Sequence, residues 1–204
     1  MRTRLATLVC LGLLGLLVCA MIAGSSDRSW AVSVRDSPGW KPLVDPESTS
    51  ALLGRRLNAP LVKVPFKGGA HGLDSLGLAV LRGLHQAKPD SLLALCVSDE
   101  EFRDILWREF PQSRPAVGLT WEDAWRILYA RLHAGVYHGV RDFGGHRYEF
   151  VRFECDSIMR YRNFRMYSKL TLVAKSDEGE LVRMKWLRGV VERQGRCKIY
   201  STED

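Results

Sequence analysis

Hydrophobic residues follow three different patterns along the chain, and the first is an uninterrupted apolar run. Arg2 and Arg4 precede a segment from Leu5 to Gly24 that contains no charged residue. Arginines placed before such a run stay on the cytoplasmic side, so the pattern predicts an export signal or a membrane anchor. We therefore expect the rest of the chain on the periplasmic or extracellular face of a membrane.

Three fates are consistent with this segment. Its length of about 20 residues is that of a membrane-spanning helix and exceeds most signal-peptide cores. Small residues nevertheless permit cleavage after Ala20 or Gly24, and Cys19 offers a lipidation site. Residues 1–24 are predicted to be a cleaved signal peptide, a retained anchor that contacts the membrane through residues 5–24, or a lipidated segment.

Residues 25–60 show no sustained periodicity and contain serines and prolines throughout. This composition predicts a flexible linker that tethers a single domain formed by residues 61–204. At the start of that domain, residues 61–67 are expected to form a short extended segment, which Pro65 would confine to a sheet edge.

Helical periodicity dominates the first half of the predicted domain. Apolar residues recur three and four positions apart, and capping residues and prolines mark the ends of each run. Ser98 and Glu101 have the spacing of a capping box, and Thr120 and Gly144 bracket the longest helical pattern. The predicted helices cover about residues 74–87, 90–95, 98–110 and 120–143.

From His146 onward the periodicity changes to two, which indicates strands. The turn sequences at 177–179 and 194–195 predict that the last three strands form an antiparallel meander. Helices followed by consecutive hairpin strands predict an α+β fold with N-terminal helices packed on a curved antiparallel sheet. The expected strands span residues 146–155, 161–175, 180–193 and 196–200.

The charge of the chain argues against a nucleic-acid-binding protein. The sequence has 30 basic and 23 acidic residues and a net charge of +7. Without residues 1–24, 28 basic residues remain against the same 23 acidic ones, a net charge of +5. These charges are interspersed, so a solvent-exposed mixed-charge surface is the favoured interpretation, and loose attraction to cell-envelope polymers is the alternative.

Cysteine and histidine positions do not indicate a metal site. Cys96, Cys155 and Cys197 form no CxxC pair, and His133 and His138 miss the four-residue spacing of helical zinc motifs. Neither a metal nor another cofactor is therefore predicted. Outside the cytoplasm one disulfide among the three cysteines is permitted, and the other interpretation is that they are small buried apolar residues.

Two charged residues interrupt apolar strand faces. Side chains alternate between the two faces of a sheet along each strand. This alternation places Glu149 on the same sheet face as Cys155, and Arg188 on the same face as Trp186. Buried charge is unfavourable unless it is paired, so these positions are unusual. We take Glu149 and Arg188 as candidate ligand-binding residues that orient a polar ligand, with Trp186 as an apolar wall. The alternative is that both charges reach solvent or form structural pairs.

Trp107, Trp121 and Trp125 flank a proline-rich break between two predicted helices. On the surface, they would form a platform for a carbohydrate or a peptide. Between packed helices, they would be part of the core, which is the interpretation that their amphipathic surroundings favour.

The order of elements resembles the nuclear transport factor 2-like superfamily over about residues 70–202. The pattern EEF…W…P…RP and the terminal segment GVVERQGRCKIYS, residues 189–201, are also similar to exported bacterial proteins of unknown function. The resemblance implies a cone-like fold whose open end holds a small ligand. Some members of the superfamily are isomerases or dehydratases and many only bind. No catalytic motif of an enzymatic branch is located here, so catalytic residues stay unassigned.

These features together predict an extracytoplasmic domain, membrane-anchored or secreted, that binds a small molecule or a cell-envelope partner without catalysis. The alternative is a small pocket enzyme of the isomerase, dehydratase or hydrolase kind. Tyr167, Lys169 and Lys175 alternate on one sheet face and offer a third interpretation, an envelope-contact surface. Homodimerisation through the sheet is left open.

Overall fold

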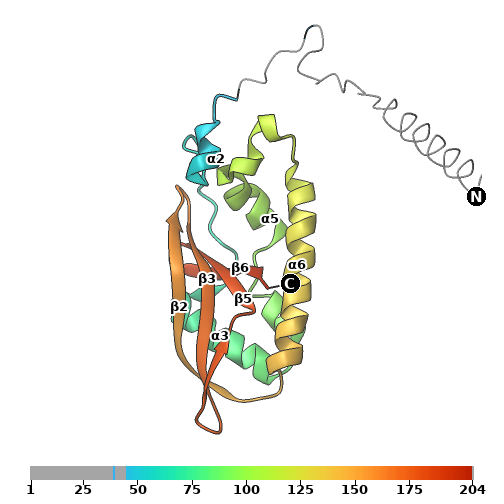
Figure 1. The fold of residues 1–204 in the computed structure, drawn as a ribbon, viewed down its shortest axis with the longest axis vertical. Helices are drawn as coiled ribbons and strands as arrows, with labels where there is room; N and C mark the ends of the chain where they lie inside the picture. The colour runs from blue at the N-terminus through green and yellow to red at the C-terminus, as the bar shows by residue number, and fades with distance from the viewer. Residues whose placement is uncertain (1–38, 40–44, 204) are drawn as a thin grey trace, which may run out of the picture. The chain divides into compact units, whose positions relative to one another are not determined.

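A strongly curled antiparallel sheet forms one layer of the protein, and helices pack against it (Figure 1). The computed structural model describes Gly39 and residues 45–203. The chain from Val44 onward forms one compact unit. The predicted signal or anchor, residues 1–24, lies outside the described residues, as do residues 25–38 and 40–44.

Within residues 45–203 the sheet has six strands, and all neighbouring pairs are antiparallel. The order is β1-β6-β5-β3-β2, and β4 and β5 pair with opposite halves of β3. The predicted strand 180–193 is therefore interrupted between Met184 and Leu187. The strands are β1 (Ala70–His71), β2 (Tyr148–Arg160), β3 (Arg165–Ser176), β4 (Leu181–Met184), β5 (Leu187–Arg193) and β6 (Arg196–Thr202).

The helices precede the strands, apart from the short β1, which gives the α+β order expected from the sequence. The α-helices are α2 (Thr49–Leu53), α3 (Gly72–His85), α4 (Pro89–Leu93), α5 (Asp99–Glu101) and α6 (Trp121–Phe143). Between α5 and α6 lie a π-helical turn, η2 (Phe102–Leu106), and three 3₁₀ turns, η3 (Trp107–Glu109), η4 (Pro111–Ser113) and η5 (Pro115–Val117).

Several sequence signals are confirmed at the ends of these elements. Ser98 and Glu101 form the predicted capping box at the start of α5. The Thr120 side chain accepts a hydrogen bond from the Asp123 amide at the start of α6, and Gly144 follows its last residue. Gln194 and Gly195 have φ angles of 51° and 76°, the left-handed pair that a two-residue turn between β5 and β6 requires.

Two predicted elements differ from the observed ones. Residues 61–67 do not form a strand, because side chains take the place of a neighbouring strand. Asn163 accepts a hydrogen bond from the Val62 amide (2.8 Å), and Arg193 donates to the Val62 and Val64 carbonyls (2.5 and 2.9 Å). The predicted helix 98–110 begins at its expected cap but widens into η2 and then tightens into η3.

The C-terminal part of the predicted linker, residues 45–60, belongs to the compact unit. Arg114 forms an ion pair with Asp45, and the Arg56 amide donates to the Glu109 carbonyl (2.8 Å). The methyl side chain of Ala59 is fully buried. Polar composition alone does not reveal such anchoring, because its partners lie far along the chain.

Helix α6 lies along the sheet and contacts it through small residues. A Cβ atom at Gly139 would lie 2.7 Å from the Trp186 indole, and one at Gly135 would lie 2.2 Å from the Thr202 hydroxyl. These glycines let the helix backbone approach β6 and the residue between β4 and β5. Few α6 side chains are buried, so most of the surface of this helix is accessible to solvent or to a ligand.

Two acidic side chains are buried with their partners. Glu101 and Lys198 are 3% and 4% exposed, and Lys198 Nζ lies 2.7 Å from Glu101 Oε2. Glu109 is fully buried and accepts the backbone amides of Arg162 (2.5 Å) and Asn163 (2.6 Å). Buried carboxylates persist only where partners replace water, so both are structural anchors.

Candidate functional site

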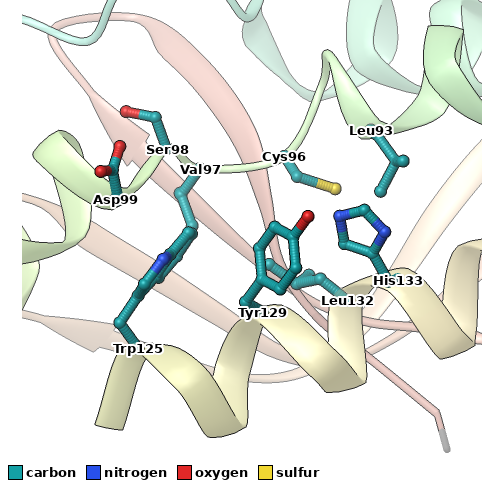
Figure 2. Close-up of a pocket in the computed structure, with 9 residues that line it drawn as sticks. All are labelled: Leu93, Cys96, Val97, Ser98, Asp99, Trp125, Tyr129, Leu132 and His133. Atoms are coloured by element: carbon teal, nitrogen blue, oxygen red, sulfur yellow. The ribbon is translucent and has the colours of Figure 1, made fainter. Parts of the chain in front are cut away.

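A cavity of about 350 Å³ lies between the segment that joins α4 to α5 and one face of α6 (Figure 2). The Val97 amide donates to the Ile199 carbonyl (3.0 Å), and the Ile199 amide donates to the Leu95 carbonyl (2.9 Å). These bonds fix the α4–α5 segment to β6 and so set the width of the cavity. We call it the α6 cleft; its lining residues are Leu93, Cys96, Val97, Ser98, Asp99, Trp125, Tyr129, Leu132 and His133.

Helical spacing places a row of rings along the cleft. Trp121, Trp125, Tyr129 and His133 are four positions apart and therefore share one face of α6. The ring centroids of Trp125 and Tyr129 are 5.8 Å apart, and those of Tyr129 and His133 are 4.0 Å apart. Tyr129 is nevertheless 48% exposed. The row combines fixed ring positions with surface open to a ligand.

Neighbouring side chains hold the tryptophans of this row in place. The Phe102 ring in η2 lies 5.5 Å from the Trp125 ring, and the Arg103 guanidinium lies 5.4 Å from the Trp121 centroid. A second cavity of about 280 Å³ shares Trp125 and Tyr129 with the cleft. Trp125 and Tyr129 therefore line both cavities.

The polar rim of the cleft is set by the capping box of α5. The Ser98 hydroxyl accepts the Glu101 amide (3.2 Å), and the Ser98 amide donates to the Glu101 carboxylate (2.9 Å). The same carboxylate binds the buried Lys198 ammonium. The rim residues Ser98 and Asp99 are therefore connected to β6 by a buried ion pair, which limits their movement.

The Cys96 thiol lies in the cleft but is not suited to nucleophilic chemistry. Figure 2 shows it turned toward the same space as Tyr129 and His133. Burial raises the pKa of the thiol to about 12, and the charge of Lys198 opposes this shift. Among the hydrogen bonds of residues 45–203, none joins Cys96 to His133 or Tyr129; the thiol donates weakly to the Leu92 carbonyl. A thiol–imidazole pair is therefore not formed.

We expect Cys96 to be alkylated far more slowly than the more accessible Cys155 at pH 8. A pKa of about 12 in place of 9.0 lowers the thiolate fraction about a thousandfold. Peptide-level mass spectrometry after iodoacetamide treatment measures both sites in one sample. The Cys96 rate should keep rising above pH 9, whereas a plateau near pH 9 would contradict the burial effect.

The residues predicted from the strand pattern lie apart from this cleft. Trp186 is buried beneath α6, and its indole nitrogen has no hydrogen-bond partner among the described residues. Arg188 is exposed and pairs with Glu203 at 3.0 Å. Glu149 is exposed and lines a separate groove of about 420 Å³ with Arg82 and other residues of α3 and β2. The three do not line a common cavity among those described.

Register shifts in β2 and β5, together with the break between β4 and β5, explain why simple alternation along the strands misplaced the two charges. The β2 register shifts between Phe150 and Arg152, and the β5 register shifts on both sides of Gly189. A bulge inserts one residue and reverses which side chains face the core. Glu149 and Arg188 consequently point to solvent rather than into the apolar layer, which corrects the predicted placement. Their contact with a ligand stays a prediction.

The tryptophans found in the sequence divide between the two interpretations. Trp107 and Trp125 both contact the core through Phe102 (5.8 and 5.5 Å), and Trp125 also lines cavities, as the half-buried Trp121 does. Sequence reasoning did not select Tyr129, His133, Cys96 or Asp99. The four-residue spacing of the α6 rings was a usable signal, whereas Cys96 and Asp99 reach the cleft only through the tertiary fold.

Residues 45–203 contain no cluster of three or more His, Cys, Asp or Glu side chains arranged for a metal ion. Cys96, Cys155 and Cys197 are free thiols. In the same part of the chain, no helix has the length and apolar character needed to cross a membrane.

Comparisons of the chain with profiles of protein families, with curated proteins and with solved structures found no significant match.

Proposed function

We propose that this protein is an exported binding or accessory domain without catalytic activity, and that the α6 cleft is its ligand site. The observation that carries the proposal is the α6 cleft itself: a cavity lined by half-exposed rings, in which the buried thiol stays protonated. Ligand sites are typically apolar and aromatic cavities with a few placed polar groups. Ser98, Asp99 and His133 are such groups here.

The cellular part of the proposal comes from the N-terminal sequence. Residues 1–24 have the charge and hydropathy of a signal or an anchor, so the cleft would face the periplasm or the exterior. We also propose that the domain is a bacterial, cone-like member of the nuclear transport factor 2-like superfamily. The curled sheet with helices packed on it is compatible with that fold. Fractionation, with the intact mass of the mature protein, tests export and cleavage.

The enzyme alternative has less support in the geometry. General acid–base and nucleophilic catalysis need paired groups within hydrogen-bond reach. In the described hydrogen bonds, the titratable side chains of the cleft are not joined to one another, and Cys96 is held as a thiol. A binding role requires neither feature.

A thermal-shift screen of small molecules on the full-length chain tests the proposed site. A ligand that binds only the folded protein raises its melting temperature. We expect these shifts to disappear when Trp125→Ala and Tyr129→Ala are combined, because the two rings form the wall of the cleft. Tyr137→Ala, which removes an exposed ring elsewhere on α6, should retain them.

Equal shifts in the double variant and in the wild type would place the ligand outside the α6 cleft and contradict the proposal. Chemical conversion of a stabilising compound, lost in the same double variant, would favour the pocket-enzyme alternative.

A further inference from the structure

We propose that the ligand of the α6 cleft carries an organic ammonium group, such as a trimethylammonium. This inference rests on the proposed function, since it assigns a chemical class to the ligand of that same site. Three observations carry it: the charge of the lining, the arrangement of the rings and the lack of a partner for the carboxylate at the rim.

The charge of the cleft is opposite in sign to that of the protein. The chain after residue 24 has a net charge of +5, yet the lining contains the carboxylate of Asp99 and no lysine or arginine. Nearby cations are already engaged: Lys198 binds Glu101, and Arg103 donates two hydrogen bonds of 2.9 Å to Asp104. A cationic ligand therefore meets a site of complementary charge.

The rings form two walls rather than one flat platform. The planes of Trp125 and Tyr129 are inclined by 53°, with centroids 5.8 Å apart. Further rings, Phe102 beside Trp125 and His133 beside Tyr129, restrain both. Aromatic faces attract cations, Trp most strongly, and angled rings that surround an alkylammonium group are a known mode of its recognition.

Asp99 completes the arrangement from the opposite side of the cleft. Figure 2 shows its side chain on the α5 side, across from the α6 rings. No other described side chain forms a hydrogen bond or an ion pair with this carboxylate. The pKa of Arg103 is raised mainly by its hydrogen bond to Asp104, and the charge of Asp99 adds only a minor contribution. An exposed carboxylate that is free of an ion pair can neutralise a ligand cation without losing an existing contact.

A neutral sugar is the main competing ligand, because it also stacks on exposed rings. The Ser98 hydroxyl keeps its own proton to donate to a sugar, and Asp99 can accept from a sugar hydroxyl. A neutral sugar has no charge to pair with Asp99, however, and the lining has no lysine or arginine. The charge of the lining therefore favours the cation.

Calorimetric titration of the full-length chain with choline tests this inference. The neutral comparison is 3,3-dimethylbutanol, in which carbon replaces the charged nitrogen. We expect choline to bind and the neutral compound to bind at least about tenfold more weakly. Trp125→Leu should weaken choline binding about tenfold, Trp125→Phe less, and Asp99→Asn several-fold. The matched controls Tyr137→Leu and Asp90→Asn should leave it unchanged.

Separate results distinguish this inference from the proposed function. Equal binding of choline and its neutral analogue would overturn the ammonium assignment. Binding of N-acetylglucosamine oligomers in the cleft without choline binding would also overturn it, while the proposed site would stand. Failure of choline together with failure of the thermal-shift screen would overturn both. Displacement of choline by phosphatidylcholine vesicles would support a lipid headgroup as the natural source of the ammonium group. If the vesicles do not displace choline, the natural ligand is a soluble compound.

Discussion

Replacing Lys198 by methionine is expected to lower the free energy of unfolding by about 3–5 kcal/mol. Lys198 and Glu101 are almost completely buried and lie 2.7 Å apart. Removing the ammonium leaves the Glu101 carboxylate in the interior with only the amides of Lys67 (2.6 Å) and Ser98 (2.9 Å). Two neutral donors do not replace a charged partner in an environment of low dielectric constant.

Urea denaturation followed by circular dichroism measures this effect. Lys67→Met is the matched control, because Lys67 forms an exposed ion pair with the neighbouring Glu100. We expect this control to change the midpoint little. Combining Lys198→Met with Glu101→Gln removes both charges and should cost less stability than Lys198→Met alone. Equal midpoints for Lys198→Met and Lys67→Met would show that the buried pair has no structural role.

Glu109→Ala should have an effect of similar size, a loss of about 3–5 kcal/mol. The carboxylate is fully buried and accepts the amides of Arg162 and Asn163. It also acts on Arg193: burial lowers the pKa of that guanidinium, and the charge of Glu109 opposes the shift. The variant therefore leaves the amides of Arg162 and Asn163 without their acceptor and removes the carboxylate charge that acts on the buried Arg193 guanidinium, which keeps only its carbonyl partners.

The same denaturation measurement tests this second prediction. Glu109→Gln keeps one acceptor of the same shape but loses the charge, so its loss of stability should be intermediate. Glu178→Ala, in the exposed turn between β3 and β4, is the control and should leave the midpoint unchanged. A wild-type midpoint for Glu109→Ala would contradict the role of this carboxylate as an anchor.

The sequence predicted the elements whose signals are local. The capping box at Ser98, the start of α6 at Thr120 and the turn at Gln194-Gly195 depend on residues within a few positions of one another. Such signals were enough to predict the α+β class and the antiparallel order of the last strands. They required no knowledge of which segments meet in space.

The differences arise where distant residues decide the structure. The register shifts in β2 and β5 change the faces on which Glu149 and Arg188 lie, and Gly189 inside a strand pattern was a local signal only for the shift in β5. Residues 45–60 have the composition of a linker, but Arg114 pairs with Asp45, and the Glu109 carbonyl accepts the Arg56 amide. Anchors of this kind become visible only in the folded chain.

The candidate site depends both on a local sequence pattern and on a contact between distant segments. The spacing of Trp121, Trp125, Tyr129 and His133 is a local pattern that was present in the sequence. Its significance depended on the α4–α5 segment, which β6 holds opposite these rings. Without that segment the row would be an exposed aromatic stripe rather than the wall of a cavity.

The location of ligand binding is the central claim, and indole ¹⁵N NMR of the full-length chain tests it most directly. Assignment by Trp121→Phe, Trp125→Phe and Trp186→Phe identifies the three relevant signals. With a library of small-molecule fragments as probes, we predict that binding fragments shift the Trp125 signal, and in part that of Trp121, while that of the buried Trp186 stays unchanged. Fragments that bind the protein and leave the Trp125 signal in place would contradict the α6 cleft as the ligand site.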